Sequence, residues 1–187
     1  MAWQCEHSAD SSASPEAVWD RYVDVENWSE WSKKGVERSS LDGRFEVGSK
    51  GTSKAPHLPK GSFELIVVEP EQRFVSKAKL PGATLFFEHI IEPAGGGSRI
   101  THRAILDGPL TFLWSPVVGR IIERGLPSGV DRLAELTVEK QEEARREAEE
   151  EKEHEEKLQE ADERFKEEIE KTSLGDEDRG GASIPGA

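Results

Sequence analysis

Cysteine is nearly absent from this sequence, since Cys5 is the only one among 187 residues. An internal disulfide is therefore excluded, and a single thiol fits a reducing compartment, so we expect a cytoplasmic location. Long apolar runs are also missing. None approaches the ~18 residues that a bilayer-spanning helix needs, so we expect no membrane insertion. The N-terminus, MAWQCEHSAD, has no basic region followed by an apolar stretch, and thus no visible secretory signal.

Positive charge is scarce as well. The chain carries 38 acidic and 25 basic residues, which gives a formal net charge of −13. Without a basic stripe it has no electrostatic reason to bind nucleic acid, and we expect no such partner. The acidic excess is concentrated in residues 139–171, which hold 16 acidic and 8 basic residues, whereas residues 1–138 are close to balanced. This distribution predicts an ordinary domain followed by a charged appendage.

The appendage, residues 139–171, contains neither glycine nor proline and favours helix throughout. Opposite charges recur four residues apart, which is typical of a single solvated helix. An alternative stays open, because Leu158, Ala161 and Phe165 could begin an apolar seam for a protein partner or for self-association. The remaining residues, 172–187, are rich in glycine and polar residues and are predicted to be a disordered tail.

The first 138 residues have the pattern of an α+β domain. Residues 2–11 alternate between apolar and polar side chains, which predicts a strand with one buried face. Ser14 and Pro15 then favour the start of a helix, and a second short helix is expected from about Asn27, where Trp28 and Trp31 lie three residues apart. Several short strands follow, separated by glycine and proline. Residues 110–138 predict a long apolar helix, which Pro127 would bend or break.

This order of elements resembles the SRPBCC, or START-like, superfamily, and within it the polyketide cyclase/dehydrase-type members. The resemblance rests on five segments in the expected order: SPEAVWDRYVDVENWSEW, GRFEVGSKGT, VVEPEQRF, FFEHIIEPAGGGSRITHRAILDGPL and LPSGVDRLAEL. It implies a helix-grip fold, in which an antiparallel sheet of six to seven strands wraps around a long C-terminal helix, with two short helices after the first strand. It also implies a hydrophobic cavity between the sheet and that helix.

Histidines are the candidate functional groups of this cavity. The strand near residues 83–93 has an apolar face interrupted by one histidine, and this face consists of Ala83, Leu85, Phe87, His89 and Ile91. If Ile91 pairs with Ile100 around the glycine turn, His89 lies opposite His102, with their Cβ atoms ~4.5–5.5 Å apart. His7 is on the buried face of the first strand, which the resemblance places beside the last strand. Three histidines are therefore expected to converge.

These histidines have three open interpretations. They could be catalytic acids or bases, with His89 and His102 as the candidates, or contacts for a bound ligand, or buried groups bonded to neighbouring strands. A metal site is not expected, because their spacing matches no metal motif. No G-x-S-x-G elbow, phosphate loop or dinucleotide fingerprint occurs, so we expect no cofactor.

The favoured function is the binding of a small hydrophobic or amphipathic molecule, polyketide-like or lipid-like, in the internal cavity. Its expected contacts are His7, Trp28, Trp31, Leu85, Phe87, His89, His102 and Trp114. One alternative is a cyclase or dehydratase that uses the cavity histidines, and whether the protein is an enzyme is left open. A second alternative is an interaction protein that acts through its acidic helix.

Overall fold

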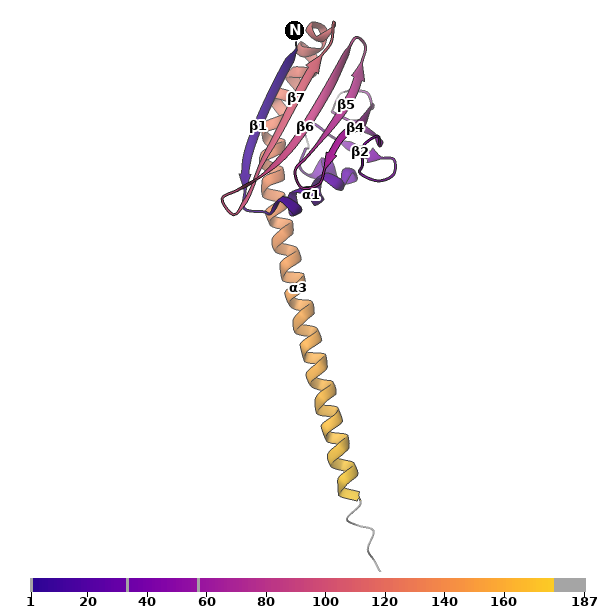
Figure 1. Ribbon diagram of the computed structural model, residues 1–187, viewed down its shortest axis with the longest axis vertical. Coiled ribbons are helices and arrows are strands. Elements are labelled where there is room, and N and C mark those ends of the chain that lie inside the picture. The colour runs from indigo at the N-terminus through magenta and orange to yellow at the C-terminus, as the bar shows by residue number, and fades with distance from the viewer. Residues whose placement is uncertain (1, 33, 57, 177–187) are drawn as a thin grey trace, which may run out of the picture. The chain divides into compact units, whose positions relative to one another are not determined.

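The computed structural model describes residues 2–32, 34–56 and 58–176. The chain divides between Gln141 and Glu142 into two compact units. The elements, several of them labelled in Figure 1, are β1 (Trp3–Ser11), α1 (Pro15–Val23), η1 (Val25–Glu30), β2 (Arg38–Leu41), β3 (Lys50–Lys54), β4 (Gly61–Glu69), β5 (Arg73–Leu80), β6 (Ala83–Ala94), β7 (Gly97–Asp107), α2 (Thr111–Trp114), the π-helical turn η2 (Ser115–Gly119) and α3 (Arg120–Asp176).

The first unit is built on one antiparallel sheet of seven strands in the order β1-β7-β6-β5-β4-β3-β2. The chain runs along it from β2 to β7, and β1 joins the edge beside β7. The opening turns of α3 belong to the same unit, and Val130 and Leu133 from them pack in one core cluster with Phe74 and Ile100 of the sheet. The predicted helix-grip fold is confirmed.

The two short helices follow β1 as expected. Ser14 caps α1, since its Oγ accepts a hydrogen bond from the Ala17 amide at 3.2 Å, and Pro15 occupies the first turn. The helix thereby presents Val18 and Tyr22 to the core, where both are fully buried. The 3-10 helix η1 then turns the chain so that Trp28 also enters the core. α1 and η1 thus place Val18, Tyr22 and Trp28 in the core cluster against the sheet.

Two regions depart from simple sequence patterns. An Asp-Gly pair often marks a tight hairpin turn, but after Asp42-Gly43 residues 42–49 form an irregular connection from which Phe45 packs onto the core. In β4 a register shift between Leu65 and Val67 reverses the alternation of side chains. Glu69, which regular alternation would put on the inner face, instead forms an ion pair with Arg73 at 2.8 Å.

Proline does not end the last helix. α3 continues through Pro127, whereas the sequence predicted a bend or break there. The helix ends at Asp176, so residues 172–176 are helical although we predicted that the tail begins at residue 172; the rest of that predicted tail lies outside the described residues.

The second unit begins at Glu142 and contains the C-terminal part of α3. Its side chains are exposed wherever the structure describes them, up to residue 167. Ion pairs at four-residue spacing include Glu153 with Lys157 at 2.7 Å and Glu160 with Arg164 at 3.4 Å. Exposed pairs of this kind each contribute only ~0.2–0.5 kcal/mol. Among the described residues, no helix is both long and apolar enough to cross a membrane.

Candidate functional site

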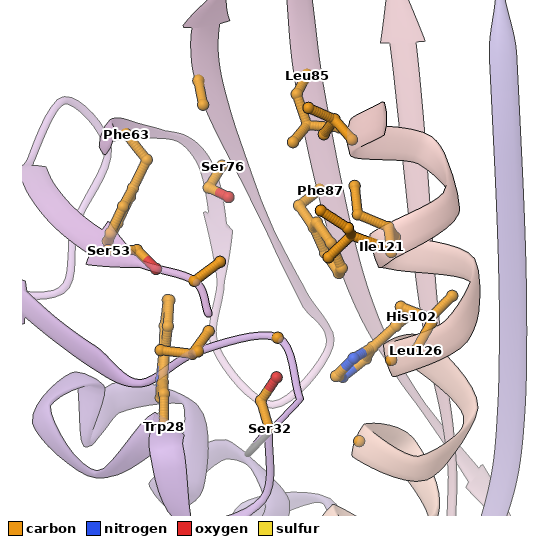
Figure 2. Close-up of a pocket in the computed structure, with 18 of the residues that line it drawn as sticks. Trp28, Ser32, Ser53, Phe63, Ser76, Leu85, Phe87, His102, Ile121 and Leu126 are labelled. Atoms are coloured by element: carbon orange, nitrogen blue, oxygen red, sulfur yellow. The ribbon is translucent and has the colours of Figure 1, made fainter. Parts of the chain in front are cut away.

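An internal cavity of about 230 Å³ lies in the first unit, between the inner face of the sheet and the start of α3. Figure 2 shows Leu85 and Phe87 of β6 beside Ile121 and Leu126 of α3, with Trp28 and Phe63 on the opposite side of the cavity. Apart from Leu85, Phe87, Ile121 and Leu126, the described lining residues come from η1 and the loop after it, from β3 to β7 with the loop between β3 and β4, and from the last helical region. They are Trp28, Trp31, Ser32, Gly35, Val36, Ser53, Ala55, Leu58, Phe63, Ser76, Ala78, His89, His102, Val118, Ile122, Gly125 and Gly129.

No charged side chain is among the described residues that line this cavity. The polar groups that reach it are the hydroxyls of Ser32, Ser53 and Ser76 and the two imidazoles of His89 and His102. The rest of the wall is aliphatic or aromatic. A buried ion would find no partner charge among these described side chains, so they favour an uncharged occupant.

The histidine register is the one that the sequence predicts. Ile91 pairs with Ile100, and His102 on β7 lies between His89 on β6 and His7 on β1. The rings of His89 and His102 are 4.4 Å apart between centroids and nearly perpendicular. Alternation of side chains along each strand sends both rings to the inner face, where they are almost completely buried.

His7 does not join this pair in the cavity. β1 is an edge strand, and there the His7 imidazole meets Asp131 of α3, with 3.0 Å between Nε2 and the carboxylate oxygen. Its side chain is 32% exposed and is not part of the cavity wall. The prediction of three converging histidines therefore reduces to two, because α3 covers the inner face beside β1.

Tyr22 holds His102 in place. Its hydroxyl and His102 Nε2 are 2.9 Å apart, and both residues are buried. The backbone oxygen of Tyr22 accepts a hydrogen bond from Trp28 Nε1, also at 2.9 Å. Tyr22 lies next to the cavity rather than in its wall. Nothing in the sequence signals a bond between Tyr22 and a residue 80 positions away.

Stacking holds the His89 ring in place, and a backbone hydrogen bond with Phe87 acts on the same imidazole. Its ring lies parallel to Phe74, with centroids 4.0 Å apart, and close to Phe87 at 4.9 Å. Its Nδ1 is buried and has no hydrogen-bond partner among the described residues. An unpaired buried nitrogen costs about 1–3 kcal/mol of stability. Such a group is a candidate contact for something that enters the cavity.

Both cavity histidines are neutral near pH 7. Burial lowers the pKa of His102 to about 3, with a further contribution from repulsion by His7. Burial also lowers the pKa of His89 well below its usual value, and repulsion by His102 adds to this. Burial raises the pKa of the Tyr22 hydroxyl well above 10, so it stays protonated. The site offers neutral hydrogen-bonding groups rather than charged ones.

The two tryptophans of the NWSEW segment have a double role. Trp28 and Trp31 are 6% and 5% exposed, and both pack in the core while one side of each faces the cavity. Trp28 stacks on Phe63 at 5.7 Å and on Phe74 at 5.9 Å. They therefore form one aromatic wall of the cavity.

Six of the eight predicted contact residues line the cavity, namely Trp28, Trp31, Leu85, Phe87, His89 and His102. Trp114 does not, because its indole Nε1 donates a hydrogen bond to the Pro81 oxygen at 2.9 Å outside the cavity wall. The apolar residues that do face the cavity from this region are Val118, Ile121, Ile122 and Leu126. Sequence reasoning missed them, although their spacing marks one face of a helix.

Metal binding gains no support from this arrangement. Within the part of the chain that the structure describes, no three His, Cys, Asp or Glu side chains are grouped so that they could hold an ion.

Comparison with known proteins agrees with the fold. The family model described as "Polyketide cyclase / dehydrase and lipid transport" matches residues 2–138. No sequence among the curated proteins is a significant match to this chain.

Several solved structures are similar to the chain. The Zhui aromatase/cyclase from Streptomyces sp. R1128 has a TM-score of 0.62 at 8% identity, over 73% of this chain and 94% of that one. Norcoclaurine synthase from Thalictrum flavum has a TM-score of 0.58 at 16% identity, over 74% and 88%. Protein NE0264 from Nitrosomonas europaea has a TM-score of 0.57 at 16% identity, over 73% and 95%. At these identities the similarity establishes the fold alone.

Proposed function

Because this chain belongs to the polyketide cyclase / dehydrase and lipid transport family of the SRPBCC superfamily, we propose that it binds a small hydrophobic molecule in its internal cavity. The observation that carries this proposal is the cavity itself: about 230 Å³ of space whose described lining residues are uncharged and mainly apolar. Transfer of an apolar molecule into such a space gains ~25 cal/mol for each Å² of its surface removed from water. A cytoplasmic location, expected from the single cysteine, is part of the proposal.

A pair of matched variants tests the proposal. Leu85→Trp places an indole in the cavity, whereas Leu113→Trp makes the same change at a side chain that is 55% exposed on α2. Naphthalene is the probe, and titration calorimetry measures its binding. We expect wild type and Leu113→Trp to bind it with the same affinity, and Leu85→Trp to lose most of the binding. Equal binding by all three proteins would place the naphthalene site outside the cavity and contradict the proposal.

Acid–base catalysis by His89 and His102 is the enzymatic alternative. The lowered pKa of His102, about 3, opposes it, because a histidine of such low basicity is a poor acceptor for a substrate proton near pH 7. An enzyme would convert a polyketide-like carbonyl substrate, and His89→Ala and His102→Ala would abolish turnover. Turnover that survives both changes would remove the two histidines from the mechanism.

The interaction alternative concerns the acidic helix of the second unit. Leu158 and Phe165 are 58% and 61% exposed there, and they are the most apolar part of the predicted seam. A replacement of both by glutamine leaves the helix propensity high and removes the apolar groups. Analytical ultracentrifugation of this variant and of wild type shows whether the helix mediates self-association. A lower mass for the variant would support self-association, whereas two identical monomers would exclude it.

A further inference from the structure

The direction of the hydrogen bond between Tyr22 and His102 follows from burial. The Tyr22 side chain is completely buried, and His102 Nε2 is the only hydrogen-bond partner of its hydroxyl among the described residues. If Nε2 were the donor, the hydroxyl hydrogen would be buried without an acceptor, which costs about 1–3 kcal/mol. The hydroxyl therefore donates to Nε2, and in a neutral imidazole the proton is then on Nδ1.

His102 consequently offers an N–H group to the cavity. Its ring lines the cavity wall, and Nδ1 makes no hydrogen bond to any described residue. Figure 2 shows the imidazole on the side of the cavity formed by β7 and α3, below Phe87. Nδ1 is not among the buried atoms that lack a partner, so it opens onto the cavity, where a carbonyl, ether or hydroxyl oxygen of the occupant best satisfies it.

The cavity volume indicates how much of an occupant can be enclosed. A cavity of ~150 Å³ in another protein is filled by one benzene molecule. The cavity here, at about 230 Å³, is larger by a factor of 230/150. Scaling benzene by this factor gives an occupant of about nine non-hydrogen atoms. The aromatic wall of Trp28, Phe63 and Phe87 favours a flat ring within that volume.

From these observations we propose that Tyr22 fixes His102 as a neutral hydrogen-bond donor, and that the cavity selects a small uncharged aromatic ligand with one acceptor oxygen. This inference rests on the proposed function, since it names the class of molecule that the cavity holds. It also assigns Tyr22 as a positioning residue, because it acts on the ligand only through His102.

Three probes of nearly equal size and shape test the inference. Acetophenone carries an acceptor oxygen, α-methylstyrene replaces that oxygen by a methylene group, and benzoate carries a negative charge. Titration calorimetry at pH 7 gives the affinity of the full-length protein for each. We expect acetophenone to bind about 2–10-fold more tightly than α-methylstyrene, the range that one net hydrogen bond supplies. Benzoate should bind at least about 100-fold more weakly than acetophenone, because its charge would be buried without a partner.

Tyr22→Phe tests the positioning role. In this variant Nε2 of His102 loses its donor, so the proton is no longer confined to Nδ1. The preference for acetophenone over α-methylstyrene should fall toward 1, while the affinity for α-methylstyrene changes by less than about twofold. If Tyr22 had a purely structural role, its replacement would weaken the binding of both probes equally and leave the ratio of their affinities unchanged. That result would overturn the assignment.

A measurement on the wild type keeps the test valid if Tyr22→Phe does not fold. The ¹⁵N chemical shifts of His102 report which ring nitrogen carries the proton. We expect an Nδ1-protonated ring whose Nδ1 signal moves when acetophenone is added. An Nε2-protonated ring would overturn the inference, as would equal binding of acetophenone and α-methylstyrene or tight binding of benzoate. In those cases the proposed function still stands if α-methylstyrene binds; it fails if neither neutral probe nor naphthalene binds.

Discussion

Replacement of the two neighbouring cavity histidines by phenylalanine should change stability in opposite directions. In His89→Phe the new ring can keep the stacking on Phe74, where the two rings are now 4.0 Å apart. The change removes the buried Nδ1 that has no partner among the described residues. Because an unpaired buried polar group costs about 1–3 kcal/mol, the unliganded variant should be more stable than wild type by about 1–2 kcal/mol.

His102→Phe should have the reverse effect. The Tyr22 hydroxyl would lose its acceptor at 2.9 Å and remain buried, which costs about 1–3 kcal/mol. The adjoining cavity of about 230 Å³ can take up the extra volume of either ring, so overpacking does not dominate the comparison.

Thermal unfolding followed by circular dichroism at pH 7 measures both effects. For a chain of this length, 1 kcal/mol shifts the midpoint by ~2–4 °C. The midpoint of His89→Phe should therefore rise by about 2–8 °C, and that of His102→Phe should fall by about 2–12 °C. A decrease of equal size in both variants would refute the reasoning, because it would mean that His89 Nδ1 is satisfied in the folded protein.

Three further predictions concern pH, packing and the acidic helix. The pKa of His102 is lowered to about 3 in the folded protein, so on acidification the unfolded chain takes up the proton of this histidine first. The free energy of unfolding should therefore fall as the pH drops from 6.5 to 5. The slope should reach up to ~1.4 kcal/mol per pH unit for each buried histidine. Denaturant titrations at several pH values should give a smaller slope for His102→Phe than for wild type. An unchanged slope would contradict this pH prediction. Gly51→Ala should lower stability by about 1–3 kcal/mol, because a Cβ atom there would lie 2.6 Å from the Ser40 backbone oxygen and would also clash with the Phe63 ring. Gly61→Ala is the control, since the nearest neighbour of its Cβ atom would be 3.9 Å away. Deletion of residues 142–187 should leave the unfolding midpoint of the first unit within about 2 °C of wild type, since surface ion pairs contribute little; a larger decrease would show that the second unit stabilises the first.

Strand pairing near the cavity was predictable from the sequence. The apolar alternation on β6 and β7 and the glycine turn between them leave one register that buries Ile91 against Ile100. That register places His89 beside His102 on the inner face. A shift by one residue would have exposed the whole apolar face. The hydrophobic pattern was therefore sufficient to predict the pairing register of β6 and β7.

Other parts of the site depend on packing that no local pattern records. The alternation of β1 predicts that His7 faces inward, but it does not show that α3 covers that edge and supplies Asp131. The register shift after Leu65, which turns Glu69 away from the inner face, has no signal in the residues around it. The bond between Tyr22 and His102 joins two elements that are distant in sequence, and only the assembled fold brings them together.

We propose above all that an uncharged small molecule occupies the cavity. The most direct measurement is mass spectrometry of the small molecules released by denaturing full-length protein purified from its own host, with Leu85→Trp purified in parallel. We expect a neutral aromatic compound with at least one oxygen, present in wild type at up to one equivalent and strongly reduced in the variant. A charged compound, or the same amount of compound from both proteins, would contradict the account.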